Sequence, residues 1–249
     1  MSWRSAGGMI ANLSGLDPIA AGKQARAEGF GWVAVKLADG ETASPSPLSW
    51  IASFRAASGL PVGGWTVLRD QPVAEAQLAA SLLAQDHLDF YIADAEQEYG
   101  YTNGSDHSLG RLHRSREFVA AFRATDPTIP AGLSSFCKPD AHDLDWGAWA
   151  ANGFAFLPQA YVSQLTTDGA PGVCATSAEQ WFPRSSIHPT LGIFPGTYPV
   201  PTAAEYAAML LQAGTTGFSL YPFEYADAAE LDSYGAQIHS TSIAQPSVP

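Results

Sequence analysis

The feature that most constrains the fold of this chain is a regular alternation of strand-like and helix-like segments along its 249 residues. Short runs rich in β-branched and aromatic residues recur between longer stretches with apolar residues at helical spacing. The pattern predicts eight strands, which are Gly8–Ser14, Trp32–Ala38, Val62–Leu68, Phe90–Glu96, Ile129–Ser135, Phe154–Val162, Pro189–Phe194 and Gly217–Phe223.

Helices are predicted between these strands. Thr202 and Glu205 have the spacing of a capping box, and Gly214 is placed to end the helix that they begin. Pro72 suits the start of another helix. The predicted helices are Pro18–Glu28, Ser49–Ala57, Val73–Leu88, Ser115–Thr125, Asp145–Ala151, Ser177–Phe182, Thr202–Gly214 and Ala228–His239.

Eight strand–helix units in one chain of this length predict an α/β protein with a single-domain (β/α)8 TIM-type barrel, a fold of typically about 250 residues. A doubly wound open sheet is the alternative, but it usually has fewer units. The first strand is followed by no glycine-rich phosphate-binding fingerprint. We expect the barrel to span residues 1–240 and residues 241–249 to form a flexible, proline-containing tail.

Composition excludes several classes of protein. The 24 acidic residues against 12 Lys and Arg give a net charge of −12, which argues against a nucleic-acid partner. No apolar run is long enough to predict a membrane span, and the 46% hydrophobic content excludes a disordered chain. The first residues lack a basic region followed by an apolar stretch, so no secretion signal is predicted.

Neither the cysteines nor the histidines predict a metal site. Cys137 and Cys174 fit no metal-ligand spacing and form either two buried free thiols, the interpretation we favour, or one disulfide. The six histidines are scattered, and no H-E-x-x-H pattern occurs. No metal and no cofactor are therefore expected.

Acidic residues at the end of the fourth predicted strand are the strongest candidates for catalysis. Asp94, Glu96 and Glu98 alternate along the chain, so an unbroken strand would point all three the same way. Like charges this close raise at least one pKa, and one protonated carboxyl beside one carboxylate is what glycosidic-bond cleavage needs. The alternative is a solvated loop edge, but the acids extend an apolar strand, where unused charges are costly.

Other polar and aromatic residues fall at predicted strand ends, where barrel enzymes place their sites. Aromatic faces stack on sugar rings, although any single aromatic residue could instead fill the core. The candidate substrate-binding residues are Asp39, Trp65, Asp70, Tyr99, Gln159, Tyr161, Tyr221 and Glu224.

Several of these segments resemble the family-25 glycoside hydrolases, which are lysozymes with a (β/α)8-type barrel that cut peptidoglycan and occur in phages and actinobacteria. The resemblance lies in the segments 31–40 (GWVAVKLADG), 61–69 (PVGGWTVLR), 92–96 (IADAE) and 156–161 (FLPQAY). It implies that Glu96 is the general acid and Asp94 its acidic partner. The aspartate that this family carries on its first strand has Asn12 as its nearest counterpart here.

A second resemblance is to the family-18 chitinases. The run from Asp94 to Tyr99 is similar to their D-x-D-x-E-Y strand end, with Glu96 in place of the middle aspartate, and this resemblance makes Glu98 the acid. Both resemblances imply a polysaccharide partner of the cell-wall type. The other function we consider is a catalytically silent barrel that serves as a structural or carbohydrate-binding part of a phage tail, a virion or a cell surface.

Overall fold

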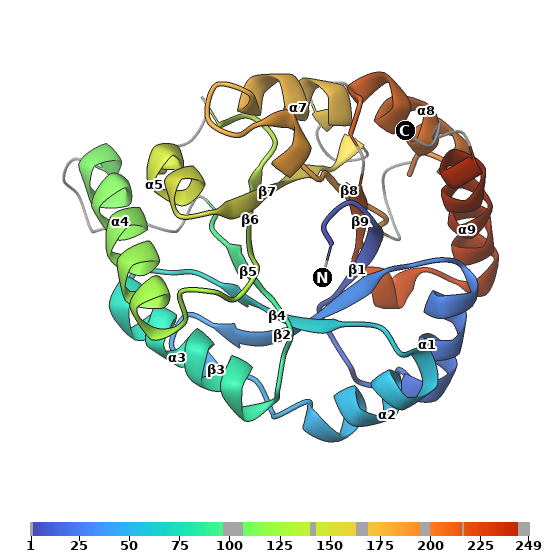
Figure 1. Ribbon diagram of the computed structural model, residues 1–249, viewed down its shortest axis with the longest axis horizontal. Helices are drawn as coiled ribbons and strands as arrows, with labels where there is room; N and C mark the ends of the chain where they lie inside the picture. Colours follow the sequence, from blue (N-terminus) through green and yellow to red (C-terminus); the bar gives the residue numbers. More distant parts are fainter. Residues whose placement is uncertain are drawn as a thin grey trace.

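Eight parallel strands form a closed barrel in the computed structural model, which describes residues 2–96, 107–139, 143–162, 169–194, 200–215 and 217–243. Each strand pairs with the next along the chain, and the last strand pairs with the first, which closes the ring (Figure 1). The predicted (β/α)8 barrel is therefore confirmed. Its strands are β1 (Ala6–Ile10), β2 (Trp32–Asp39), β4 (Val62–Val67), β5 (Tyr91–Asp94), β6 (Ala131–Phe136), β7 (Phe154–Ala160), β8 (Thr190–Gly192) and β9 (Phe218–Tyr221).

Helices surround the barrel, and local sequence signals fix where several begin and end. Thr202 and Glu205 form the predicted capping box, and Gly214 ends that helix with a positive φ of 63°. Pro18, Pro72 and Pro171 each stand in the first turn of a helix. The helices are α1 (Pro18–Ala27), α2 (Leu48–Ser58), α3 (Pro72–Gln85), α4 (His107–Thr125), α5 (Trp146–Ala151), α7 (Pro171–Ala178), α8 (Ala203–Ala213) and α9 (Ala228–Ile243), with short 3-10 helices η3 (Arg184–Ser186) and η4 (Phe223–Tyr225).

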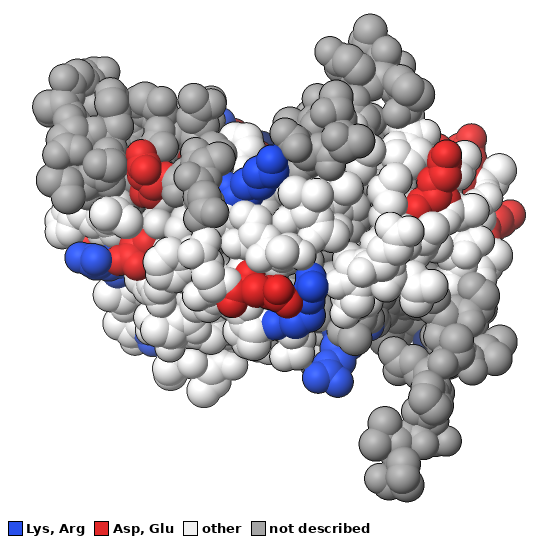
Figure 2. Space-filling model, turned by 90° about the horizontal axis from the view of Figure 1, so that it is seen from above, with Lys and Arg blue, Asp and Glu red and all other residues white. Residues whose placement is uncertain are grey.

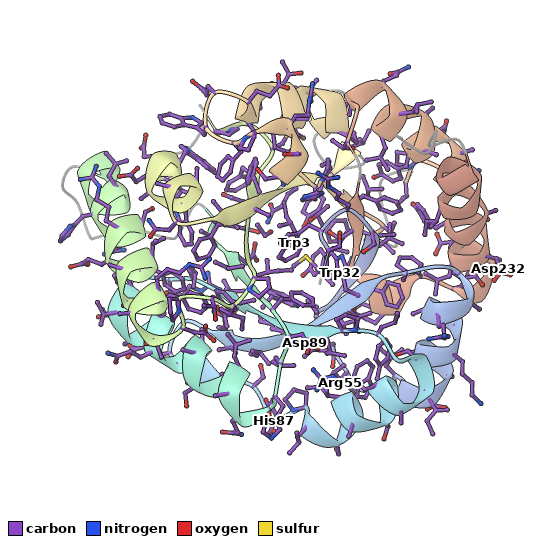
Figure 3. The ribbon with its side chains drawn as sticks, viewed as in Figure 1. Trp3, Trp32, Arg55, His87, Asp89 and Asp232 are labelled. Carbon is purple, nitrogen blue, oxygen red and sulfur yellow. A yellow bond between two sulfur atoms is a disulfide. The ribbon has the colours of Figure 1, made fainter. Side chains whose placement is uncertain are left out.

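Large aromatic side chains fill one end of the barrel interior. Trp32 lies beside Gly7 of the neighbouring strand, where a Cβ atom would come within 2.0 Å of the indole. Gly63 makes the same room for Phe90, at 2.3 Å. Trp3 packs edge-on against both Trp32 and Phe90, with ring centroids 5.4 and 5.3 Å apart, and lies with Trp32 inside the ring in Figure 3. This packing closes the interior at the end where the strands begin, so open space is left at their other ends.

An arginine on α2 fixes the start of β5. Arg55 donates to the His87 carbonyl at 2.7 Å and to the Asp89 carboxylate at 2.6 Å. The same carboxylate accepts the backbone N–H of Val62, the first residue of β4. Asp89 thereby ties the segment that leads into β5 to the neighbouring strand and helix.

Most predicted elements have somewhat different bounds in the structure, and one short strand was not predicted. The first strand ends at Ile10 instead of Ser14, because the backbone N–H groups of Ala11 and Asn12 donate to the Glu224 carboxylate instead of to a strand. A short antiparallel strand, β3 (Thr42–Ala43), was not predicted and pairs with the end of β2 across a turn at Gly40. The helix expected at 177–182 is wrong for most of its length, because α7 begins at Pro171 and already ends at Ala178.

The favoured interpretation of the cysteines is wrong, because Cys137 and Cys174 form a disulfide. Cys137 directly follows β6, and Cys174 lies in α7, so the bond joins a barrel strand to an outer helix. Both cysteines are buried. Spacing could not reveal the pairing, because a sequence separation of 37 leaves the distance between the two cysteines undetermined.

On the face shown in Figure 2, the charged side chains lie in a few small groups on a largely uncharged surface, and acidic and basic atoms adjoin in some of these groups. No helix in the described part of the chain is long and apolar enough to cross a membrane. Helix α9 continues to Ile243, and residues 244–249 of the predicted tail lie outside the described ranges.

Candidate active site

A cavity of about 270 Å³ opens where the barrel strands end. Two carboxyl side chains, a serine and an amide share it with a set of aromatic rings. Most of these residues are at or just past the last position of their strand, which is where barrel enzymes carry their sites. The lining residues are Met9, Trp65, Asp94, Glu96, Ser134, Phe136, Gln159, Tyr161, Phe194 and Tyr221.

The side chains of Asp94 and Glu96 point into this cavity together, as their alternation along the fourth barrel strand predicts. Asp94 Oδ1 accepts hydrogen bonds from Ser134 Oγ at 2.8 Å and from Gln159 Nε2 at 3.1 Å. The same nitrogen donates to Glu96 Oε1 at 2.7 Å. Because both oxygens accept from one amide nitrogen, they lie within about 6 Å of each other.

The two carboxyl groups differ in their burial, and burial changes the pKa of the deeper one. Asp94 is 9% exposed, whereas Glu96 is half-buried. Burial, followed by the negative charge of Glu96, raises the pKa of Asp94 from 3.8 to about 7, against the lowering effect of its hydrogen bonds and of Lys36. Near neutral pH the deeper carboxyl therefore exchanges a proton readily, while a second carboxyl lies beside it.

Aromatic rings form the remaining wall. Trp65 is held by a hydrogen bond from its indole N–H to the Ile10 carbonyl, at 2.9 Å. Tyr221 packs edge-on to Trp65 and is nearly parallel to Tyr161, with centroids 5.8 and 6.2 Å away. Phe194 closes the group against both tyrosines. Burial raises the pKa of Tyr161 and of Tyr221 above the usual value, so both hydroxyls stay protonated.

Asp39 lies next to this wall, outside the lining. Its carboxylate accepts two hydrogen bonds from Arg69, at 2.7 and 3.1 Å, and one from Lys36 at 3.3 Å. The Arg69 and Lys36 contacts outweigh burial and lower the pKa of Asp39. Lys36 Nζ lies 5.4 Å over the ring of Trp65, which lines the cavity, so Lys36 connects Asp39 to the cavity wall.

Two further candidates also lie outside the lining. Glu224 accepts the backbone N–H groups of Ala11 and Asn12, so its carboxylate organises the turn after β1. Asp70 is exposed, and its backbone N–H donates to the buried Glu75 carboxylate. Glu98 and Tyr99 lie outside the described residues.

Four lining residues were not predicted from the sequence, which are Met9, Ser134, Phe136 and Phe194. Ser134 and Phe136 alternate at the end of β6, so their parity could have placed them on the inner face. In the described ranges, no group of three or more His, Cys, Asp or Glu side chains could hold a metal ion.

No protein-family model matches the sequence. No curated protein sequence matches it either. Solved structures match it in fold. A GH18 chitinase from Cycas revoluta in complex with (GlcNAc)4 has a TM-score of 0.70 at 9% sequence identity, over 94% of this chain and 99% of that chain. A GH18 chitinase from Pseudoalteromonas aurantia has a TM-score of 0.65 at 9% identity, over 97% and 100%.

The spore cortex-lytic enzyme SleL of Bacillus megaterium has a TM-score of 0.67 at 8% identity, over 94% of this chain and 73% of that chain. At such identities these likenesses establish a shared fold, a (β/α)8 barrel like that of glycoside hydrolases. They carry neither the finer assignment to family 25 nor a phage origin.

Proposed function

We propose that this chain is a glycoside hydrolase that acts on a cell-wall polysaccharide of the peptidoglycan type. The observation that carries the proposal is the pairing of Asp94 with Glu96 in one aromatic-walled cavity at the strand ends of the barrel. The fold likeness supports the proposal, because the similar structures include chitinases, one bound to (GlcNAc)4, and a spore cortex-lytic enzyme.

In the proposed reaction Glu96 is the general acid, because it is the more accessible of the two carboxyls. It gives its proton to the glycosidic oxygen as the bond from that oxygen to the sugar C1 breaks, and the bonding electrons leave with the oxygen. Water then adds to C1 and returns a proton to Glu96. In its ionised form Asp94 supports the cationic transition state, and through Gln159 it keeps Glu96 in place.

The closeness of the two carboxyls bears on stereochemistry. Inverting enzymes separate their carboxyls by about 6.5–9.5 Å, so that a water molecule fits on the far side of the sugar. The oxygens that share Gln159 Nε2 are closer than that. If Asp94 and Glu96 are the catalytic pair, their spacing therefore favours retention.

Glu98 is the competing acid, since the chitinase resemblance gives it that role. One measurement distinguishes the two assignments of the general acid, which is the loss of turnover in Glu96→Gln compared with that in Glu98→Gln. General acid catalysis contributes about 10²- to 10⁴-fold, so the variant that loses at least 10² identifies the acid.

The alternative function is a silent barrel that binds glycan as part of a larger assembly, including a virion. It is favoured by Asn12, which stands where a family-25 enzyme has a carboxylate. Asn12 uses its side-chain oxygen to accept the backbone N–H of Ser14 at 2.9 Å, and it is exposed outside the cavity lining.

Turbidity clearing of purified peptidoglycan tests the proposal, with release of reducing ends as a second readout and pull-down of the same material in parallel. Asp232→Asn is the matched control, because Asp232 is exposed on the outer helix α9 (Figure 3). We expect clearing by the native chain and by Asp232→Asn, and its loss in Glu96→Gln. Binding without clearing supports the silent barrel, and neither binding nor clearing rejects both.

A further inference from the structure

The cavity has an unusual balance of charge. Among the described side chains that line it, only Asp94 and Glu96 are charged, and both are acidic. The two hydrogen bonds that Asp94 receives both end on Oδ1. This leaves Oδ2 of a side chain that is nine-tenths buried available to a ligand in the cavity.

The aromatic rings add to the same preference. The ring of Tyr221 lies at the centre of the wall, with its centroid 5.8 Å from Trp65, 6.2 Å from Tyr161 and 5.6 Å from Phe194. The faces of such rings carry negative electrostatic potential and attract cations, more strongly when water is excluded. An ammonium group in this space would meet carboxyl oxygens on one side and the aromatic wall on the other.

Two positively charged side chains beside the aromatic wall are already paired. Lys36 and Arg69 both bind the Asp39 carboxylate, and Lys36 lies over the Trp65 ring. Neither side chain lines the cavity. An anionic sugar substituent therefore has no cation to meet among the described lining residues, whereas a cationic substituent has two acids.

We infer that the cavity selects a hexosamine unit whose amino group is unsubstituted, so that the ligand is an N-deacetylated stretch of glycan. This inference rests on the proposed function and names the substrate class of the same site. The ammonium group lies between Asp94 and Glu96. Because a positive charge beside a carboxyl favours its ionised form, Asp94 releases its proton as the ammonium binds. The sugar ring packs along the wall of Trp65 and Tyr221. Acetylation removes the charge and adds bulk against the buried carboxyl, so it weakens binding.

Calorimetric titration at pH 6 with a glucosamine tetrasaccharide and with its fully N-acetylated counterpart tests the inference. We expect the glucosamine oligomer to bind about tenfold tighter, as one partly buried ion pair with cation–π contacts allows. Glu96→Gln should remove most of this preference. Asp232→Asn changes the net charge equally at a remote exposed position and should keep it, which separates site recognition from general attraction to an acidic protein.

The outcomes distinguish this inference from the proposed function. Tighter binding of the N-acetylated oligomer together with hydrolysis overturns the inference and leaves the function standing. Preference for glucosamine without hydrolysis of either oligomer supports the inference and counts against the enzyme. A preference that survives in Glu96→Gln, or that is lost equally in Asp232→Asn, overturns the inference. Binding of neither oligomer also overturns it, and the clearing of peptidoglycan then still decides the proposed function.

Discussion

Gln159 reaches from β7 past β6 to bind Asp94 on β5, 65 residues earlier in the chain, with its amide nitrogen 3.1 Å from Oδ1. This hydrogen bond lowers the pKa of Asp94 against the larger effect of burial. Gln159→Met removes the donor and keeps the volume, so we expect the pKa of Asp94 to rise above its value of about 7. Carboxyl NMR titration measures the shift, and Gln180→Met, at an exposed glutamine, is the control. An unchanged titration of Asp94 would contradict the prediction.

Asp94 should also make the stability of the protein depend on pH. Its pKa is raised in the folded state from 3.8 to about 7, so the folded protein holds a proton that the unfolded chain releases between these values. The free energy of unfolding contributed by this group is therefore full below pH 4 and is lost as the pH rises to about 7. Asp94→Asn abolishes this loss, so its melting temperature relative to the native chain should increase from pH 4 to pH 7 and then level off. A constant difference across this range would exclude the assigned cause.

How much of the site could be predicted depended on strand parity. Asp94 and Glu96 were found because acids at alternate positions extend an apolar strand, and Gln159 and Tyr161 share that parity on another strand. Asp39 was also at a strand end, but the sequence could not show that Arg69 and Lys36 bind it there. Contacts between residues from different units depend on how the barrel closes, which no local pattern records.

The fold was more predictable than its details, because eight units follow from local periodicity. The predicted end of a strand was wrong where a side chain from a distant part of the sequence accepts the backbone N–H groups. The first strand stops at Ile10 because Glu224, more than 200 positions later, takes the next two N–H groups. The sequence could not decide between free thiols and a disulfide, because Cys137 and Cys174 meet only when α7 packs against the barrel.

Glu224 therefore offers a test of a structural role against a substrate-binding role. Glu224→Ala leaves the N–H groups of Ala11 and Asn12 without their acceptor, and we expect a loss of about 1–3 kcal/mol in the free energy of unfolding. Glu224→Gln keeps one oxygen acceptor and should recover part of that loss. Denaturant unfolding measures both variants. Stability equal to the native chain in Glu224→Ala, with weaker glycan binding, would instead return Glu224 to the substrate-binding set.

The disulfide between Cys137 and Cys174 should contribute substantially to stability. It closes a loop over a sequence separation of 37, for which chain entropy gives about 3–4 kcal/mol. The double variant Cys137→Ala with Cys174→Ala should lose about this much in the free energy of unfolding. Reduction of the native chain should cause a similar loss and should have no effect on the double variant. A native chain whose melting temperature is the same with and without reductant would contradict the prediction.

The closed end of the barrel depends on glycines that admit aromatic rings. A Cβ at position 7 would lie 2.0 Å from the Trp32 indole, which is 0% exposed and packed between Trp3 and Phe90, so it has nowhere to move. Gly7→Ala should therefore destabilise the fold by about 1–3 kcal/mol or more. Gly172→Ala is the matched control, because a Cβ in that helix meets Ala213 at an ordinary 3.9 Å and should stabilise slightly. If Gly7→Ala unfolds at the same denaturant concentration as the native chain, Trp32 is less tightly held than the barrel packing requires.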